Sequence, residues 1–235
     1  MKKKSSVFRK IVFSCVVLCV LIGGGIYFYN QPEEEDEQEI LTVACVGDSL
    51  TFRRAYGAEE IHNYPEFLSE MLGASYDVTN YGEAGACVWQ DGNYPYENLR
   101  VYRRSVECEA DIFVIMLGTN DVWDYNWIGA ERFKQEYVRL LETYLQSEYE
   151  PEVYLCTLPK IYQQDGTPLE TGVGERIERL SDVIREVATE YGCRIIEMNQ
   201  DTASHPEWYE KDWLHFNNKG AKEIADIIGE MIQKN

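Results

Sequence analysis

The sequence predicts a three-layer α/β/α domain with a five-stranded parallel sheet, preceded by one N-terminal transmembrane helix. Three observations lead to this prediction. Strand-like and helical patterns alternate from residue 41 onward. The run IFVIML (112–117) is continuously apolar, which is typical of a central parallel strand buried on both faces. An uncharged, mostly apolar stretch of nineteen residues precedes the domain and is long enough to cross a bilayer as a helix.

The apolar stretch, residues 11–29, is predicted to be an uncleaved signal anchor. It follows a basic tail over residues 1–10, and no basic residue comes after it until Arg53. The positive-inside rule therefore places this tail in the cytoplasm and the domain outside, in a single-pass protein of the cell membrane. A cleaved signal peptide, a lipid-modified Cys15 or Cys19, and a buried helix are the alternatives. The length of the run and the lack of an A-x-A-like site disfavour cleavage.

Basic and acidic residues are unevenly distributed along the chain. The formal net charge is −19, from 22 basic and 41 acidic residues. Five of the basic residues precede the apolar stretch, which leaves 17 against 41 in the rest of the chain. Such an acidic surface repels nucleic acid, so no nucleic-acid partner is expected. The acidic run within residues 30–40 predicts a solvated linker, and the domain over 41–235 is expected to be a monomer.

The cysteine pattern indicates neither a metal site nor a disulfide framework. Outside the apolar stretch the cysteines are odd in number and have no close pair. Two of them lie within strand-like runs and are expected to be small buried hydrophobic residues. The cysteines concerned are Cys45, Cys87, Cys108, Cys156 and Cys193, of which Cys45 and Cys156 are the two in strands.

The elements of the domain follow in order along the chain. Strands are predicted at 41–46, 76–79, 112–117, 152–157 and 194–197. Helices are predicted near 64–72, 130–147, 173–191 and 219–234. In the second of these helices apolar residues recur at helical spacing, for example Phe133, Tyr137 and Leu140. This alternation predicts right-handed crossovers and a single domain without internal repeats.

Polar segments follow the strands at the positions where such sheets bind ligands. In open parallel sheets, ligands lie beyond the carboxyl ends of the strands. The first strand is followed by GDS (47–49), the second by NYGEAG (80–85) and the third by GTND (118–121). The segment DWLHFN (212–217) comes before the last helix. We expect all four segments at one edge of the sheet.

Ser49 is the candidate nucleophile. A serine hydroxyl is weak by itself and needs a base to take its proton. Asp212 precedes His215 by three residues, so its carboxylate can reach the ring Nδ1–H and leave Nε2 toward Ser49. The other histidines, His62 and His205, have no such partner in the sequence and are expected to be structural or exposed.

Acyl transfer also needs hydrogen-bond donors where negative charge develops on the carbonyl oxygen. Each such donor typically lowers the barrier by about 3–4 kcal/mol. The candidates are the backbone amides of Ser49 and Gly85 and the side-chain amide of Asn120. Glycine allows a close backbone approach at Gly85. Taken singly, Gly85 and the GTND segment could be ordinary turns; their order and placement together favour an oxyanion hole.

These segments resemble the four sequence blocks of the SGNH hydrolases, also called the GDSL esterase/lipase family. VGDSLT resembles the nucleophile block, NYGEAGA the glycine block, LGTND the G-x-N-D block and DWLHFNNKG the D-x-x-H block. Asn217 and Gly220 also match a common continuation of the last block. The resemblance runs from about residue 41 to the C-terminus, and four blocks in order are far more specific than GDSL alone.

The resemblance implies a flavodoxin-like fold and a role for each matching residue. Ser49 corresponds to the nucleophile, His215 to the general base and Asp212 to the residue that orients the base. Ser49, Gly85 and Asn120 correspond to the oxyanion hole. The family uses no metal or organic cofactor.

One departure from the family follows the nucleophile. Relatives often have a glycine soon after the threonine of this block, whereas here Thr51 is followed by FRRAYGAEE. Arg53 and Arg54 either bind an anionic group on the substrate or form ion pairs on an acidic surface.

Aromatic residues in the loops after the second and third strands suggest a carbohydrate substrate. Flat rings at a cleft stack on sugar rings, with polar neighbours for the hydroxyls. Ordinary loop packing is the alternative, and the chain has no long apolar insertion that could form a lipid tunnel. The aromatic residues are Trp89, Tyr94, Tyr96, Trp123 and Trp127, and the candidate substrate contacts are Arg53, Trp89, Tyr94 and Trp123.

The chain is similar to carbohydrate acetylesterases, including sialate-O-acetylesterase-like members of the family. This similarity predicts hydrolysis of acetyl or other short acyl esters on a glycan outside the cell, through an acyl-enzyme on Ser49. A lysophospholipase or thioesterase, and a glycan O-acyltransferase, use the same machinery and remain alternatives. A non-enzymatic glycan-binding module is a third.

Overall fold

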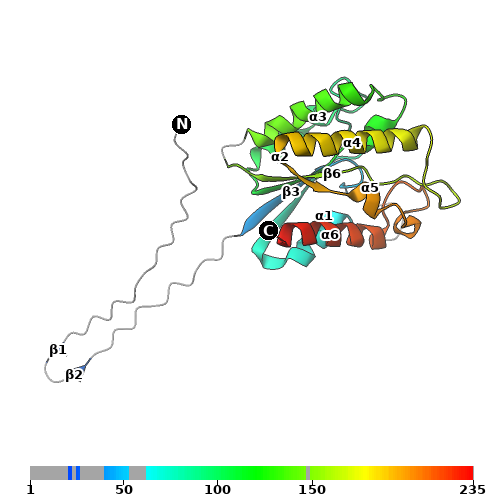
Figure 1. Ribbon diagram of the computed structural model, residues 1–235. Coiled ribbons are helices and arrows are strands. Elements are labelled where there is room, and N and C mark those ends of the chain that lie inside the picture. The colour runs from blue at the N-terminus through cyan, green and yellow to red at the C-terminus, as the bar shows by residue number, and fades with distance from the viewer. Residues whose placement is uncertain (1–20, 23–24, 27–39, 53–61, 147–148, 235) are drawn as a thin grey trace. The chain divides into compact units, whose positions relative to one another are not determined.

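The computed structural model describes residues 21–22, 25–26, 40–52, 62–146 and 149–234. The chain divides into two units, Met1–Gln38 and Glu39–Asn235. In the first unit, β1 (Leu21–Ile22) pairs with β2 (Gly25–Ile26) in antiparallel register. Among the described residues of the second unit, five strands and six α-helices follow one another, in alternation up to β7 (Figure 1).

The N-terminal predictions fall mostly outside the described residues. This holds for the basic tail (1–10), for the linker (30–40) except its last residue, and for most of the predicted membrane helix (11–29). At the four residues of β1 and β2 the backbone is extended, where the sequence predicts a helix. Among the described residues, no helix combines the length and apolar character that a membrane span needs.

The sheet of the second unit is parallel throughout. Its strands are β3 (Leu41–Gly47), β4 (Tyr76–Gly82), β5 (Ile112–Met116), β6 (Glu152–Cys156) and β7 (Arg194–Ile196). Their order is β4-β3-β5-β6-β7. The predicted five-stranded sheet is thus confirmed, with strand limits that shift by up to three residues. The order reverses between β3 and β5, which is the switch point where such sheets bind ligands.

Helices cover both faces of the sheet (Figure 1). α1 (Tyr64–Leu72) and α6 (Asn218–Gln233) pack together on one face. α2 (Arg100–Glu107), α3 (Ala130–Leu145) and α4 (Val173–Tyr191) cover the other, and the short α5 (Met198–Asp201) follows β7. Short 3₁₀ turns complete the connections at Gly73–Ser75, Tyr96–Asn98, Thr119–Val122 and Pro206–Trp208.

The central strand β5 explains why both faces carry a core. All five of its residues are buried. Phe113 and Ile115 belong to the core under α2, α3 and α4, whereas Val114 and Met116 belong to the core under α1 and α6. Because side chains alternate along a strand, a continuously apolar sequence supplies both layers at once.

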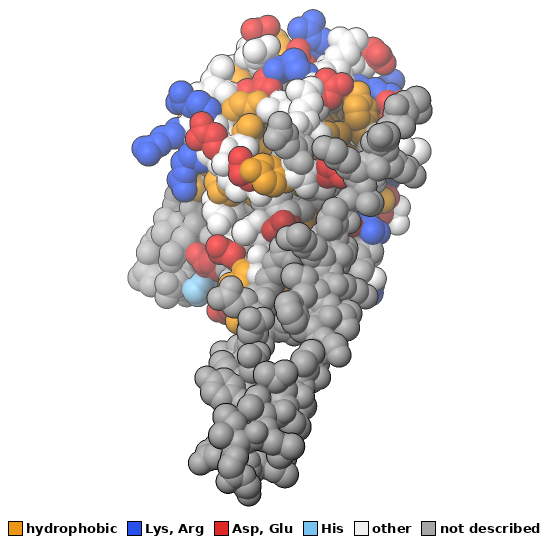
Figure 2. Space-filling model, turned by 90° about the vertical axis from the view of Figure 1, so that its left-hand side faces the viewer, with side chains coloured by type: hydrophobic (Ala, Val, Ile, Leu, Met, Phe, Trp, Pro, Cys, Tyr) orange, Lys and Arg blue, Asp and Glu red, His pale blue; other side chains and the backbone are white. Residues whose placement is uncertain are grey.

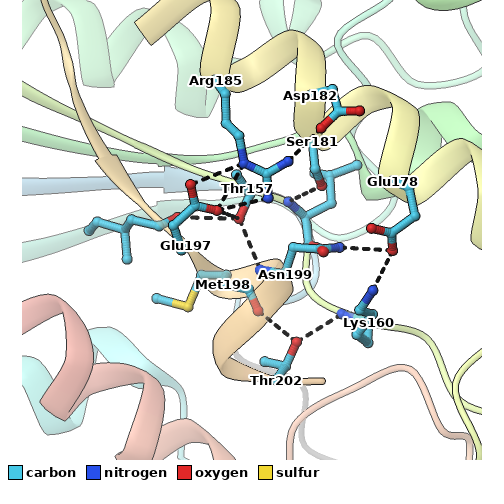
Figure 3. A network of polar contacts seen from close by, with 12 residues as sticks. Thr157, Lys160, Glu178, Ser181, Asp182, Arg185, Glu197, Met198, Asn199 and Thr202 are labelled. Carbon is cyan, nitrogen blue, oxygen red and sulfur yellow. Dashed lines mark hydrogen bonds and ion pairs between the residues drawn. The ribbon is translucent and has the colours of Figure 1, made fainter. Parts of the chain in front are cut away.

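Polar side chains join the ends of β6 and β7 to α4. Figure 3 shows this network. The Asn199 side chain is buried and donates from Nδ2 to the Leu158 carbonyl oxygen at 3.0 Å and to Glu178 Oε1 at 3.3 Å. The Asn199 backbone amide donates to Thr157 Oγ1 at 2.9 Å. The loop that follows β6 is thereby fixed at the edge of the sheet.

Replacing Asn199 by alanine is expected to destabilise the fold by about 1–3 kcal/mol. The substitution leaves the buried Leu158 carbonyl without its side-chain donor. Urea denaturation of the full chain measures the free energy of unfolding. Asn98, at an exposed position, supplies the control Asn98→Ala, which should change it by less than about 0.5 kcal/mol. Equal stability of the two variants would contradict a bracing role for Asn199.

Ion pairs link helices on the surface. Lys134 on α3 contacts Glu190 on α4 at 2.7 Å and Glu186 at 3.2 Å. Figure 2 shows one face of the molecule, where basic, acidic and hydrophobic side chains are interspersed. Exposed pairs of this kind contribute roughly 0–1 kcal/mol each. The two apolar cores therefore carry most of the stability.

Candidate active site

Ser49 lies in a tight turn directly after β3. The amides of Thr51 and Phe52 donate to the Asp48 carbonyl oxygen at 3.1 and 2.8 Å. At Gly47 a Cβ atom would lie 2.0 Å from Thr51 Oγ1, so only glycine permits this close approach. The turn leaves Ser49 partly exposed at the carboxyl end of the strand.

Ser49, His215 and Asp212 form a continuous chain of hydrogen bonds. His215 Nε2 lies 3.0 Å from Ser49 Oγ, and His215 Nδ1 lies 2.7 Å from Asp212 Oδ2. In the tautomer with the proton on Nδ1, the ring donates to Asp212 and its Nε2 accepts from the Ser49 hydroxyl. The structure therefore brings together residues that are 166 positions apart in the chain.

The Asp212 carboxylate is held in its charged form. Partial burial alone raises its pKa, but the hydrogen bonds from His215 and Leu214 outweigh burial, so the pKa lies below the ordinary value. Asp212 Oδ1 accepts from the amides of Leu214 at 3.1 Å and His215 at 2.9 Å. An ionised Asp212 fixes the orientation of the His215 ring and stabilises the imidazolium form.

The loop that carries His215 is braced from two sides. Trp213 has a φ of 60°, in the left-handed region that non-glycine residues rarely adopt. Its amide donates to the Glu210 carbonyl oxygen, and its own carbonyl oxygen accepts from the Tyr162 amide, both at 3.0 Å. Glu210 in turn donates its amide to the His215 carbonyl oxygen at 2.7 Å. These bonds hold the strained backbone in place.

The three predicted oxyanion donors follow neighbouring strands. Ser49 follows β3, Gly85 follows β4 and Asn120 follows β5, and β3 lies between the other two. Gly85 is exposed with a φ of 81°. Asn120 Nδ2 donates to the Ala86 carbonyl oxygen at 2.9 Å, which places Asn120 beside Gly85. Within the described part of the chain, the amides of Ser49 and Gly85 donate to no protein acceptor.

The aromatic candidates divide into rim and core. Tyr94 is exposed, and its Cδ1 atom lies 4.0 Å from where a Cβ of Gly85 would be. Trp89, Trp123 and Trp127 are partly buried, and the last two pack against the core. Tyr96 is fully buried and donates to the Tyr81 carbonyl oxygen at 2.6 Å, so it is a core residue. Arg53 and Arg54 lie outside the described residues.

The other two histidines do have carboxylate partners, contrary to the prediction. His62 Nδ1 lies 2.9 Å from Glu66 Oε2, and His205 Nδ1 lies 3.1 Å from Glu207 Oε1. The second ring also stacks on Trp208, with the two ring centroids 4.0 Å apart. Both pairs join residues that are close to each other in sequence, four residues apart for His62 and Glu66 and two for His205 and Glu207.

Two buried carboxyl groups flank the candidate site. Asp48 precedes Ser49, and Asp121 follows Asn120; both are almost fully buried. The pKa of each is raised to about 7, mainly by burial, and the Asp48 charge contributes to the shift at Asp121. The hydrogen bond from the Leu50 amide to Asp48 Oδ1, at 2.9 Å, offsets part of the pKa shift at that carboxyl. Asp48 Oδ2 has no hydrogen-bond partner among the described residues.

Asp48→Asn is expected to change how stability depends on pH. The folded wild type keeps the Asp48 proton up to about pH 7, whereas the unfolded chain loses it near pH 4. The raised pKa of Asp48 therefore contributes its full stabilisation to the folded state below about pH 4. This contribution to the free energy of unfolding is lost as the pH rises through about 7. From pH 5 to pH 8, the free energy of unfolding of Asp48→Asn should rise by about 2 kcal/mol relative to that of the wild type.

Urea denaturation at both pH values measures this difference. Asp91→Asn, at an exposed loop position, is the matched control and should track the wild type. A difference between Asp48→Asn and wild type that is the same at pH 5 and pH 8 would contradict the assignment of a proton to Asp48.

Three further residues of this region, Asp121, Asn126 and Trp213, hold its loops in place. Asp121 accepts hydrogen bonds from the amides of Val88 and Trp89 at 3.0–3.1 Å. Asn126 donates to the Asn120 carbonyl oxygen, and the backbone of Trp213 is hydrogen-bonded to Glu210 and Tyr162 in the loop that carries His215. Asp121 directly follows Asn120 in the GTND segment. An acidic residue so soon after a buried strand is a sequence signal for a role in the site. Nothing in the sequence marks Asn126 or the backbone strain at Trp213.

The chain belongs to the GDSL-like lipase/acylhydrolase family, whose model matches residues 45–223. The predicted SGNH relationship is therefore confirmed, and it places the chain in a class of carboxylic ester hydrolases. The matched range includes all four sequence blocks.

The chain is similar to individual esterases in sequence and in fold. An acetylxylan esterase of Xylanibacter ruminicola is 25% identical over 216 residues, which cover 84% of this chain and 44% of that protein. The chain thus spans less than half of that relative. A carbohydrate acetylesterase from Sinorhizobium meliloti shares the fold, with a TM-score of 0.64 at 17% identity over 83% of this chain and 99% of that one. A lipase/acylhydrolase from Enterococcus faecalis gives 0.65 at 20% identity, with 83% and 96% covered.

Proposed function

We propose that the protein is a serine esterase that removes acetyl or other short acyl groups from a carbohydrate, through an acyl-enzyme on Ser49. The hydrogen-bonded chain of Ser49, His215 and Asp212 carries this proposal. It is the arrangement that turns a serine hydroxyl into a nucleophile.

In the first half-reaction, Ser49 Oγ attacks the ester carbonyl carbon while His215 Nε2 accepts the hydroxyl proton. The amides of Ser49, Gly85 and Asn120 stabilise the negative charge on the carbonyl oxygen. The tetrahedral intermediate collapses, the bond from the carbonyl carbon to the sugar oxygen breaks, and His215 donates its proton to that oxygen, which leaves as the sugar hydroxyl.

In the second half-reaction, water attacks the acyl-enzyme. His215 accepts a proton from this water, and the same donors stabilise the second oxyanion. The bond to Ser49 Oγ breaks, His215 returns the proton to Ser49, and the carboxylic acid leaves. Asp212 keeps the His215 ring in one orientation through both steps.

Exposed tyrosines in the loops of the candidate site, and the names of two relatives, support a carbohydrate substrate. Tyr94 and Tyr125 are exposed in the loops that follow β4 and β5, and the Tyr94 ring lies beside Gly85. Exposed tyrosine rings suit stacking on sugars. Two relatives are named for esters of xylan or other carbohydrates.

An ester panel with the full-length chain in detergent tests the proposed substrate class. The substrates are aryl esters from acetyl to octanoyl and acetylated xylo-oligosaccharides, and the readouts are released acid and alcohol. We expect the acetyl esters to have the highest kcat/KM and the oligosaccharides to release acetate. A kcat/KM that rises with chain length would instead favour a lysophospholipase or thioesterase.

Two further outcomes separate the remaining alternatives. An acetylated sugar product formed when a free glycan is added would favour an O-acyltransferase. Glycan binding without turnover of any ester would favour a binding module. Neither alternative has a specific structural observation in its favour.

The location outside the cell belongs to the same proposal. It is supported by the charge asymmetry around residues 11–29, with five basic residues before the apolar run and none directly after it. Fractionation of cells that express the full chain should find the esterase in the membrane fraction. Removal of residues 1–29 should release it, and an unchanged distribution would contradict the anchor.

A further inference from the structure

Asn126 is a buried side chain that is hydrogen-bonded at both polar ends. It lies after the 3₁₀ turn Thr119–Val122 and is 1% exposed. Its Nδ2 donates to the Asn120 carbonyl oxygen at 3.0 Å, and its Oδ1 accepts from the Asn93 amide at 2.9 Å. Its own backbone amide donates to the Trp123 carbonyl oxygen at 2.8 Å. One side chain therefore connects two loops that are far apart in sequence.

Both connected loops contribute to the candidate oxyanion hole. The loop after β5 carries Asn120, whose carbonyl oxygen accepts from Asn126. The loop after β4 carries Gly85 at its start and Asn93 near its end. Asn120 Nδ2 also donates to the Ala86 carbonyl oxygen at 2.9 Å. The two loops are thus joined beside Gly85 by Asn120 and at the far end by Asn126.

The far end of the β4 loop positions Tyr94. The Cys87 amide donates to the Tyr94 carbonyl oxygen at 3.0 Å, and the Tyr96 amide donates to the Cys87 carbonyl oxygen at 2.9 Å. The loop thereby folds back on itself and places the Tyr94 ring beside Gly85. Asn126 holds the residue that immediately precedes Tyr94.

We propose that Asn126 is a positioning residue for ester hydrolysis, a role that rests on the esterase function proposed above. It holds the backbone of Asn120 in one place relative to the loop of Gly85 and Tyr94. Pre-organised donors stabilise an oxyanion only when their geometry is fixed before reaction, and a displacement of about 1 Å can cost roughly 100-fold in rate. Asn126 itself touches no reacting atom.

The test compares Asn126→Ala and Asn126→Asp in the full-length chain. The alanine variant removes both hydrogen bonds. The aspartate variant at pH 8 keeps an acceptor for the Asn93 amide and loses the donor to the Asn120 carbonyl oxygen. Asn98→Ala and Asn98→Asp make the same changes at an exposed position and serve as matched controls.

The readout is kcat per active site on an aryl acetate. A small alkyl fluorophosphonate, which binds covalently to the nucleophilic serine and releases fluoride, counts the active sites by mass spectrometry. This count removes any unfolded fraction from the comparison. We expect kcat per labelled site to fall about 10- to 100-fold in both Asn126 variants, with KM within about threefold of wild type. The Asn98 variants should match the wild type.

The outcomes separate this inference from the esterase proposal. If the wild type neither turns over nor is labelled, the esterase function fails. If the wild type is active and a folded Asn126 variant keeps the wild-type kcat per labelled site, the positioning role is overturned. If both Asn126 variants fail to fold while the Asn98 variants fold, the positioning role is also overturned, because Asn126 would then be a structural residue alone.

Discussion

Replacing Ser49 by alanine is expected to lower kcat for an aryl acetate by about 10⁴- to 10⁶-fold. The Ser49 hydroxyl lies 3.0 Å from His215 Nε2 and is the atom that forms the acyl-enzyme in the proposed reaction. Without it, the oxyanion donors and substrate binding leave only a small residual rate. Initial rates in the full-length chain, with a thermal melt to show that the fold survives, measure this effect.

The control for this substitution is Ser204→Ala, because Ser204 is exposed and lies in a loop. That variant should keep the wild-type rate. A folded Ser49→Ala variant with kcat within tenfold of wild type would show that hydrolysis uses another nucleophile.

The second largest effect is expected at Asn120. Loss of one oxyanion donor typically costs about 10²- to 10³-fold in kcat. Asn120→Ala removes the side-chain amide that lies beside Gly85 and donates to the Ala86 carbonyl oxygen. Because an oxyanion donor acts mainly in the transition state, kcat and kcat/KM should fall together and KM should change little.

Steady-state kinetics of Asn120→Ala and of the exposed control Asn98→Ala measure this loss. An unchanged kcat with a raised KM would assign Asn120 to substrate binding. Unchanged values of both would remove Asn120 from the proposed oxyanion hole.

Local patterns predicted most of the fold because the periodicity of the core elements is strong. The apolar run of β5 and the helical spacing in α3 correspond to layers that are buried in the structure. α2 was missed because Arg100, Arg103 and Arg104 make its sequence polar. Its stability comes from residues such as Val101 and Val106 that pack against the core, and this contact depends on the tertiary fold.

The sequence predicts some residues of the candidate site and not others. Ser49, Asp212 and His215 lie in motifs whose order indicates acyl transfer, and the structure places them within hydrogen-bonding distance. Tyr96 looked like a loop aromatic near the site, yet it is fully buried because its loop folds back at Cys87. Asn126 has no local signature, since its partners are Asn120 and a backbone amide 33 residues away.

Mass spectrometry of the acyl-enzyme tests the central claim most directly. Wild-type chain is mixed with excess aryl acetate, quenched in acid during turnover and digested. We expect the mass of one acetyl group on the peptide that contains Ser49, at Ser49 itself, and none on the corresponding peptide of Ser49→Ala. An acetyl group on a different residue that appears and disappears at the rate of turnover would contradict the assignment of Ser49 as the nucleophile.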